Sequence, residues 1–215
     1  QHAARNPEQL KPLQSDIVIR YNVACSIHAF DAMQFETHAA FFEQLHPRPD
    51  ITVCVFGYLG DDKKGRTDWK EAATILHTNY TGAVSILNIA ANYYASQKAG
   101  VIAGISSVAG ERGRQSNYLY GSAKAGFTAY LSGLRNSLFS QQVHVVTVLP
   151  GFVYTKMTEN LNLPKLLTAQ PAEVADAIYT AVQKKKDIIY VRWFWRWIML
   201  IIKCVPEFIF KKLKL

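Results

Sequence analysis

The strongest constraint on the fold is an alternation of short apolar runs with longer segments of helical pattern. The apolar runs are rich in β-branched residues and end in small or helix-breaking residues; they occupy 50–57, 101–110 and 143–151. The helical segments occupy 68–98, 118–139 and 171–184. Such runs are typical of strands buried on both faces, and strands that alternate with helices form βαβ units. The sequence therefore predicts an α/β fold built on a parallel sheet.

Tyr120 and Lys124 are four residues apart in the second helical segment, so their side chains share one face of the helix. An ammonium within ~4–6 Å of a phenol favours the phenolate and lowers its pKa from the ordinary value near ~10. A phenol tuned in this way can give a proton to a carbonyl oxygen or take one from an alcohol. Ser107, near the end of the run 101–110, offers a hydroxyl to the same oxygen. A Tyr–Lys pair taken alone also arises by chance, as a surface tyrosine beside a solvated lysine.

The combined spacing of Asn79, Ser107, Tyr120 and Lys124 resembles the short-chain dehydrogenase/reductase family of Rossmann-fold oxidoreductases, over about residues 3–191. The resemblance implies a doubly wound parallel sheet in three α/β/α layers. It implies that Tyr120 transfers the proton and that Lys124 lowers the tyrosine's pKa and bonds the nicotinamide ribose. Ser107 is then expected to orient the substrate oxygen, and Asn79 to hold a water in a proton relay. By itself Asn79 also fits a satisfied amide inside a helix.

The resemblance also assigns cofactor contacts, which besides Tyr120 and Lys124 are Arg5, Asp31, Gly57, Pro150, Gly151, Val153 and Thr155. Arg5 falls just past the family's second strand, where a guanidinium can pair with an adenosine 2′-phosphate. Ala4 stands where NAD enzymes usually carry an acid for the ribose hydroxyls. NADP(H) is therefore favoured over NAD(H). Asp31 is expected to bond the adenine amino group, with a helix cap or turn role as the alternative.

Two departures from the family pattern concern the nucleotide site. The glycine-rich turn that cradles a pyrophosphate is absent, because the chain starts roughly where the family's first strand–helix–strand unit ends. We therefore expect the N-terminal strand–helix unit to be missing from the given chain, which leaves a central strand position empty and exposes apolar faces. The family's Asn-Asn-Ala-Gly segment is replaced by Cys54-Val-Phe-Gly57. This replacement puts in doubt the usual hydrogen bonds to the adenine ribose.

The composition indicates one globular domain over 1–191, followed by an aromatic and basic extension over 192–215. From Lys184 onward there are nine basic and two acidic residues, which supply nearly all of the net charge of +8. The rest is nearly neutral, which argues against nucleic-acid binding. The six histidines show no metal-ligand spacing, so no metal site is expected. The three cysteines read as reduced thiols of a cytoplasmic protein.

The extension predicts an interfacial rather than a spanning segment. Its longest uncharged run, 197–202, is far shorter than the ~20 apolar residues that a spanning helix needs. Tryptophans together with Lys and Arg suit the headgroup level of an anionic membrane, so a peripheral position on the inner face of the cell membrane is one expectation. The alternative is that these aromatics pack against the domain or a second subunit.

A tail on a bilayer would suit a lipid-linked substrate. The segments 57–61, 193–198 and 206–211 resemble the decaprenylphosphoryl-2-keto-ribose reductase subgroup of the family, which reduces a sugar ketone on a polyprenyl phosphate. Arg112 and Arg114 are candidates to meet a substrate phosphate, with contact to water as the alternative. The segment 157–168 is expected to form a lid over the substrate.

The sequence thus predicts an oxidoreductase that moves hydride between NADP(H) and a carbonyl or secondary alcohol, with a small-molecule or lipid-linked substrate. The family resemblance implies a homo-oligomer, a dimer or tetramer, formed through the helices that carry Asn79 and Tyr120. One alternative is a soluble enzyme for small ketones or acyl chains. Another is a non-catalytic scaffold of the same fold at the membrane.

Overall fold

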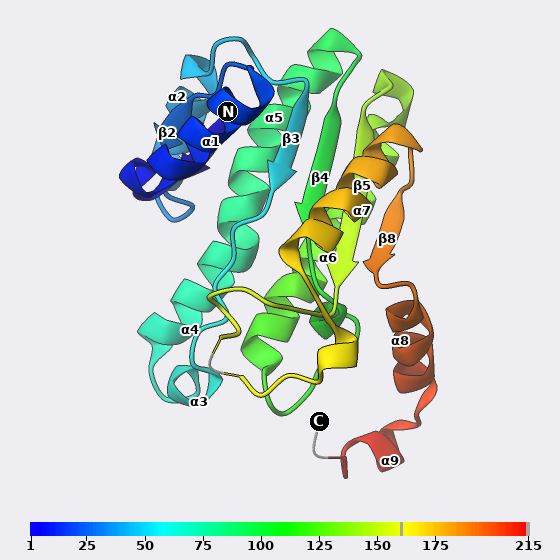
Figure 1. Cartoon of the computed structure of the whole chain (residues 1–215). Coiled ribbons are helices and arrows are strands. Elements are labelled where there is room, and N and C mark those ends of the chain that lie inside the picture. Colours follow the sequence, from blue (N-terminus) through cyan, green and yellow to red (C-terminus); the bar gives the residue numbers. More distant parts are fainter. Residues whose placement is uncertain (160, 214–215) are drawn as a thin grey trace.

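A four-stranded parallel sheet forms the centre of the computed structural model, which describes residues 1–159 and 161–213. Its order is β3–β4–β5–β8, with strands Ile51–Cys54 (β3), Val101–Ile105 (β4), His144–Pro150 (β5) and Ile188–Val191 (β8). Each neighbouring pair runs parallel, so the four carboxyl ends meet at one edge, the lower edge in Figure 1. The predicted parallel α/β sheet is confirmed.

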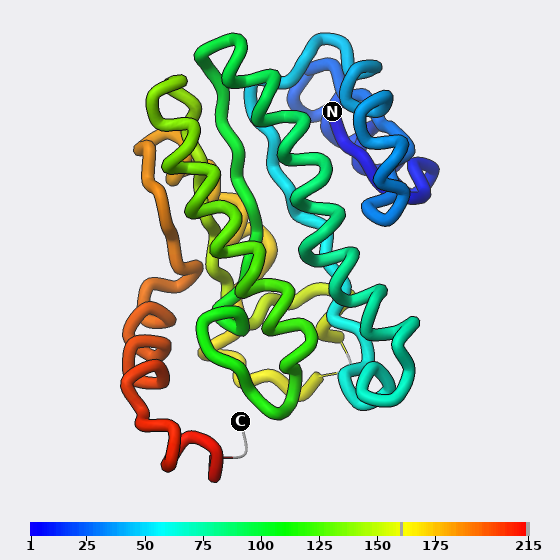
Figure 2. Tube along the Cα trace, turned by 180° about the vertical axis from the view of Figure 1, so that it is seen from behind, coloured from blue at the N-terminus to red at the C-terminus, as the bar shows by residue number. Residues whose placement is uncertain are grey.

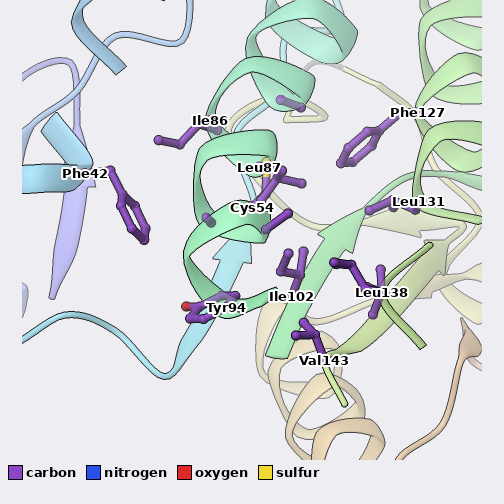
Figure 3. Packing of buried hydrophobic residues seen from close by; sticks show 14 of the residues in the cluster. Phe42, Cys54, Ile86, Leu87, Tyr94, Ile102, Phe127, Leu131, Leu138 and Val143 are labelled. Carbon is purple, nitrogen blue, oxygen red and sulfur yellow. The ribbon is translucent and has the colours of Figure 1, made fainter. Parts of the chain in front are cut away.

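Helices cover both faces of this sheet. Helices α5 (Gly82–Gln97) and α6 (Tyr118–Leu138) lie together on the face seen in Figure 2, and α7 (Pro171–Gln183) lies on the other. The larger core cluster lies between the sheet and α5 and α6; Figure 3 shows Leu87, Ile102 and Phe127 within it. A second cluster joins Val146 and Val148 of β5 to α7. The three α/β/α layers expected from the resemblance are present.

The N-terminal segment forms a separate two-stranded parallel sheet of β1 (His2–Ala4) and β2 (Ile27–Ala29). These strands are joined through the 3-10 turn Pro7–Leu10 and helix α1 (Lys11–Tyr21). After β2, the 3-10 turn Phe35–Thr37 leads into α2 (His38–Gln44), which packs against α5.

The outer edge of β3 pairs with no strand in residues 1–159 and 161–213. The alternate side chains Ile51, Val53 and Val55 are exposed, on the opposite side of β3 from Thr52 and Cys54, which face α5. In the described residues, the sheet of β1 and β2 is thus separate from the four-stranded sheet.

The predicted helix over 68–98 is interrupted in its middle. After the short helix α3 (Asp62–Gly65), it consists of α4 (Trp69–Leu76), a π-helical turn His77–Thr81, and α5. Asp68 caps the N-terminus of α4, because its side chain accepts a hydrogen bond from the backbone N–H of Lys70. π-Helical turns are rare in proteins, and those that occur are often at functional sites. Asn79 lies inside this one.

Two short strands and two terminal helices complete the fold. Strands β6 (Phe152–Val153) and β7 (Thr168–Ala169) pair in parallel beside the end of β5. Helices α8 (Phe194–Cys204) and α9 (Glu207–Phe210) follow β8 and lie below the sheet in Figure 1. Three further 3-10 turns occupy Val108–Gly110, Phe139–Gln141 and Lys165–Leu167.

Helix α8 packs against the domain along one face, where Trp195 and Met199 are buried with Val108 and Leu149. The first part of the extension therefore contributes to the core. This is the alternative that the sequence left open for some of its aromatic residues. The last two residues of the extension, 214–215, lie outside the described residues.

Candidate active site

The carboxyl ends of β3, β4 and β5 surround a cavity of about 1100 Å³. Open parallel sheets bind ligands at this edge because the loops that leave the strands diverge there. Most of the predicted site residues lie in the wall of this one cavity, namely Gly57, Ser107, Tyr120, Lys124, Pro150, Gly151, Val153 and Thr155. Residues separated by up to 98 positions in the sequence are thus brought together.

Lys124 projects from α6 towards the end of β4. Its side-chain Nζ donates a hydrogen bond to the carbonyl oxygen of Ile105 at 2.9 Å, and the residue is only 4% exposed. Burial lowers the pKa of this ammonium to about 8. The hydroxyl of Ser106 donates to the carbonyl oxygen of Lys124 at 2.9 Å, which fixes this turn of α6 against β4.

Tyr120 lies one turn earlier on α6, with its ring centroid 5.8 Å from the Nζ of Lys124. Burial raises the pKa of its phenol to about 12, and a hydrogen bond with Ser107 acts in the opposite direction. The structure therefore differs from the expectation that Lys124 lowers this pKa, because loss of solvation is the largest influence on it. A phenol with this pKa is protonated at neutral pH and can act as a proton donor.

Ser107 follows β4 directly and begins the 3-10 turn Val108–Gly110. Its Oγ accepts a hydrogen bond from the backbone N–H of Ala109 at 3.1 Å, which fixes the rotamer of the side chain. With its oxygen engaged by the backbone and its partner Tyr120 beside it, the hydroxyl is held in the cavity wall. This position suits a group that orients a substrate oxygen next to the phenol.

The side chain of Asn79 is buried and bonded to the backbone on both sides. Its Nδ2 donates to the carbonyl oxygens of Ile75 at 2.8 Å and Tyr58 at 2.6 Å, and its Oδ1 accepts from the N–H of Tyr58 at 3.1 Å. The amide thus holds the loop after β3 against the π-turn. Both of its hydrogens are occupied, as in the satisfied helix-interior amide that the sequence left open. The water-holding role stays a prediction.

Gly57 permits this close approach of loop and helix. A Cβ at Gly57 would lie 3.0 Å from the Oδ1 of Asn79 and 3.7 Å from the Nζ of Lys124. Any larger residue would therefore displace the amide or the ammonium. Gly57 is the residue of Cys54-Val-Phe-Gly57 that matches the family segment, and the site requires a glycine at this position.

The segment after β5 contributes several residues to the wall of the cavity. Val153 and Thr155 are joined through Thr158, whose Oγ1 donates to the carbonyl oxygen of Val153 at 2.6 Å and accepts from the N–H of Thr155 at 3.1 Å. Met157 and Leu161, from the predicted lid, also line the cavity. Asn160, inside that predicted lid, lies outside the described residues.

Arg5 and Asp31 lie apart from the main cavity but close to each other. Together with Phe30 and Gln34 they line a second cavity of about 360 Å³ at the ends of β1 and β2. The Oδ1 of Asp31 accepts from the N–H of Met33 at 3.0 Å, so the turn role that the sequence left open is present. The exposed guanidinium of Arg5 suits a phosphate at this place.

The two arginines proposed for a substrate phosphate have different surroundings. The Nη1 of Arg112 donates to the carbonyl oxygens of Ile202, Lys203 and Val205 at 3.1, 2.9 and 2.8 Å. Its Nη2 donates to Glu207 at 2.8 Å. Arg112 thus binds the tail, and the expectation that it meets a substrate is wrong. Arg114 lines the main cavity.

Sequence reasoning missed several residues that shape the site. The main-chain oxygen of Ile105 and the hydroxyl of Ser106 position Lys124, and neither role has a signal in the sequence. Trp195, assigned to the extension, lines the main cavity and donates from Nε1 to the carbonyl oxygen of Leu167 at 3.3 Å. The tight fit of its ring against Gly151 is visible only in three dimensions.

The sequence is similar to proteins of the short-chain dehydrogenase family. A family model described as short chain dehydrogenase matches residues 3–165. An uncharacterised oxidoreductase of Mycobacterium tuberculosis strain H37Rv is 33% identical over 214 residues, covering 98% of this chain and 86% of that protein.

Solved structures with low sequence identity share the fold. A short-chain dehydrogenase from Sphingobium yanoikuyae in complex with NADPH has a TM-score of 0.81 at 17% identity, covering 95% of this chain and 85% of its own. One from Burkholderia cenocepacia J2315 in complex with NADP has a TM-score of 0.81 at 20% identity, covering 98% and 84% respectively.

Proposed function

The chain belongs to the short-chain dehydrogenase family of oxidoreductases acting on CH–OH donors, and from this premise we propose that it reduces a carbonyl with NADP(H). The observation that carries the proposal is the convergence of Ser107, Tyr120 and Lys124 at one wall of the main cavity. Their phenol, hydroxyl and ammonium groups are the ones needed to hold a carbonyl oxygen and protonate it.

In the proposed reaction Ser107 and Tyr120 bind the substrate oxygen together. Lys124 and Thr155 would hold the nicotinamide end of the cofactor, which when bound would supply the hydride for the carbonyl carbon. Tyr120 donates its proton to the oxygen as negative charge develops there, which its pKa of about 12 permits because the phenol starts protonated. Lys124 stabilises the resulting phenolate by its charge, while Ile105 holds the ammonium in place.

Cofactor choice rests on the two ends of the nucleotide site. Lys124 and Thr155 supply polar groups in the main cavity, and Arg5 supplies a cation in the second. A guanidinium pairs with phosphate oxygens through two parallel hydrogen bonds, so Arg5 favours a cofactor with a 2′-phosphate. The two structural relatives described above are complexes with NADPH and with NADP, which supports the same preference.

The cavity wall supports a substrate with a large apolar part. Apart from the polar groups already described, the wall is built mainly from aliphatic and aromatic side chains, including Leu59, Val108, Phe152, Leu161 and Ile178. Burying such surface against a hydrocarbon is worth roughly 25 cal/mol per Å². We therefore favour a carbonyl carried on a lipid, such as a lipid-linked sugar, over a small polar ketone.

Turnover tests the reductase directly. Purified protein with NADPH is offered ketones of matched chemistry that differ in alkyl chain length, and oxidation is followed by absorbance. We expect kcat/KM to rise with chain length, and NADPH to be used in preference to NADH. Binding of neither cofactor in a fluorescence titration would instead favour the non-catalytic scaffold.

The tail has an outward apolar surface that supports peripheral membrane contact. Trp193, Trp197, Leu200 and Ile201 recur at helical spacing on the side of α8 opposite the core, and we call them the outer stripe. Trp193 is 73% exposed and Ile201 is 68% exposed. Phe208, Ile209 and Leu213 continue the exposed apolar surface. None of the helices in the described residues combines the length and apolar character needed to cross a bilayer.

Charge decides which partner this surface suits. Exposed basic residues accompany the outer stripe, namely Arg196, Lys211 and Lys212. The nearby acids are engaged: Glu207 pairs with Arg112, and Glu111 pairs with Lys203. A second copy docking through the same surface would bring two basic sets together. We therefore propose an anionic bilayer as the partner, where each basic residue contributes about 1 kcal/mol.

Vesicle flotation tests this contact. The wild type should float with vesicles of phosphatidylcholine and phosphatidylglycerol and remain at the bottom with phosphatidylcholine alone. Replacing Trp193 and Trp197 by alanine should abolish flotation. Phe139→Ala is the matched control, because Phe139 is 83% exposed but lies in the 3-10 turn Phe139–Gln141. Equal flotation of the double variant and the wild type would exclude the tail as the contact.

We also propose self-association through the helices that carry Asn79 and Tyr120. Trp69, Tyr80 and Tyr118 are exposed on α4, the π-turn and α6. This region carries both charge signs, including the pair of Arg66 with Asp62 at 3.1 Å, so two copies can meet without net repulsion. Light scattering after size exclusion should give a mass above the 24.2 kDa of one chain, and Trp69→Glu should reduce it.

A further inference from the structure

Arg114 places a cation in the wall of the main cavity. It belongs to the loop between Ser107 and α6, and Ser116, Asn117 and Tyr120 line the cavity beside it. The Nε of Arg114 is buried and has no hydrogen-bond partner. Burial also lowers the pKa of this guanidinium, because the charged form has lost solvation.

Nothing in the described part of the chain neutralises this cation. Across residues 1–159 and 161–213 its guanidinium forms neither a hydrogen bond nor an ion pair. The two acids of the cavity wall are engaged elsewhere. Asp61 accepts from the N–H groups of Lys63 and Lys64, and Asp62 accepts from Arg66 and from the N–H of Leu119.

Arg112 shows what a structural arginine looks like in the same loop. Two residues before Arg114, it donates to three carbonyl oxygens and a carboxylate of the tail. A buried charge ordinarily has such partners, since removing it from water costs free energy that only pairing restores. Arg114 has the same chemistry and is likewise half-buried, but it lacks the partners and lines the main cavity.

We propose that Arg114 binds an anionic group of the substrate, a phosphate or a carboxylate, and so selects acidic substrates; this proposal rests on the reductase function proposed for the same cavity. The planar guanidinium can pair with two oxygens of such a group at once. The unpaired Oδ1 of Asn117 and the hydroxyl of Ser116 provide an acceptor and a donor for neighbouring hydroxyl groups.

The rest of the wall limits what the anion can be attached to. The apolar residues of the same cavity, among them Phe152 and Leu161, favour a hydrocarbon beside the charged group. A phosphate or carboxylate could belong to a lipid headgroup or to a soluble metabolite. Both sources present the same chemistry to Arg114, and they differ in whether an alkyl chain adds affinity.

Calorimetric titration without turnover tests the proposal. The probes are decyl phosphate, 1-decanol and inorganic phosphate, each with wild type, Arg114→Met, Arg114→Lys and Lys63→Met. Lys63 is the matched control, because it is a second cation of the cavity wall. We expect wild type to bind decyl phosphate at least about tenfold more tightly than decanol. Arg114→Met should lose this preference, Arg114→Lys should keep part of it, and Lys63→Met should keep it all.

The probes separate the two sources of the anion. Tighter binding of decyl phosphate than of inorganic phosphate identifies a lipid-borne group, and equal binding identifies a soluble one. In wild type, added salt should weaken decyl phosphate binding and leave decanol binding unchanged. This test uses the wild type alone and so does not depend on the folding of a variant. Equal affinity of wild type for decyl phosphate and decanol overturns the proposal, as does an unchanged preference in a folded Arg114→Met protein.

These outcomes are independent of whether the chain is a reductase. If the protein prefers decyl phosphate through Arg114 but oxidises no NADPH, the anion site is supported and the proposed reaction is refuted. If the protein reduces neutral ketones but shows no preference for the phosphate, the reaction is supported and the anion site is refuted.

Discussion

The indole ring of Trp195 occupies the space that a side chain at Gly151 would fill. A Cβ atom added to Gly151 would overlap the indole of Trp195 at Cε2, Nε1 and Cζ2. Trp195 comes from α8, and Gly151 follows β5 within the predicted cofactor segment. The tail thus meets the backbone of the active-site loop directly, and the contact requires a glycine at position 151.

Gly151→Ala should therefore destabilise the protein. Adding a methyl group to a filled space costs about 1–3 kcal/mol, and urea denaturation should show a loss of that size. Gly133→Ala is the control, since a Cβ there meets nothing within 4 Å and alanine favours the helix that contains it. The loss should shrink when Gly151→Ala is combined with Trp195→Ala. Additive effects of the two changes would show that the contact is not the cause.

Tyr120→Phe should remove turnover without removing the fold. A positioned general acid contributes about 10²- to 10⁴-fold to rate, so kcat for the best ketone in the alkyl series should fall by that range. NADPH binding, followed by fluorescence, should change little. Tyr118→Phe is the matched control, because Tyr118 is on the same helix but is exposed at the surface. Full activity of Tyr120→Phe would refute the role of the phenol.

Lys124 should give stability a specific dependence on pH. Its pKa is lowered to about 8 in the folded protein from an ordinary 10.5, so between these values the unfolded chain binds more protons. Stability contributed by this site therefore rises with pH across that window. The free energy of unfolding of wild type minus that of Lys124→Met should increase by about 3 kcal/mol over the window.

Urea titrations at a series of pH values would measure this difference, which should be level below about pH 8. The exposed Lys70, replaced by methionine, controls for the change of residue type. A difference that stays constant across the window would mean that the ammonium of Lys124 is solvated as in the unfolded chain.

Arg5→Gln should change cofactor preference. Loss of a hydrogen bond to a charged group costs about 1.5–3 kcal/mol, so the Kd for NADPH should rise by roughly tenfold or more. The Kd for NADH, which has no 2′-phosphate, should stay the same. Arg20→Gln, an exposed change on α1, serves as the control. Equal weakening of both cofactors would place the 2′-phosphate away from Arg5.

The fold could be predicted from the sequence because each element carries a local signal. The β-branched run before Pro150 predicts a strand that ends there, and β5 indeed spans His144–Pro150. The helical pattern predicts a helix over 118–139, and α6 covers Tyr118–Leu138. The π-turn at Asn79 was not predictable, because it depends on hydrogen bonds to Tyr58 across the fold.

The members of the site were easier to predict than their electrostatics. Spacing alone places Tyr120 and Lys124 on one helix face, and both line the cavity. The pKa of Tyr120 went against the expectation because the burial of its phenol depends on the whole fold. Arg112 and Arg114 were indistinguishable in the sequence, since only the folded tail reveals that one is bonded and the other is not.

The open edge of β3 has a practical consequence for handling the chain of residues 1–215. Within the described residues the outer edge of β3 has no strand partner for its N–H and C=O groups, and it lies beside the exposed Ile51, Val53 and Val55. Such an edge is a template onto which another extended peptide can add. Preparations of this chain should therefore form aggregates rich in intermolecular β-structure as concentration rises. A charged residue at Val53, which points away from the α5 side of the sheet, should keep the protein in solution without touching the catalytic wall.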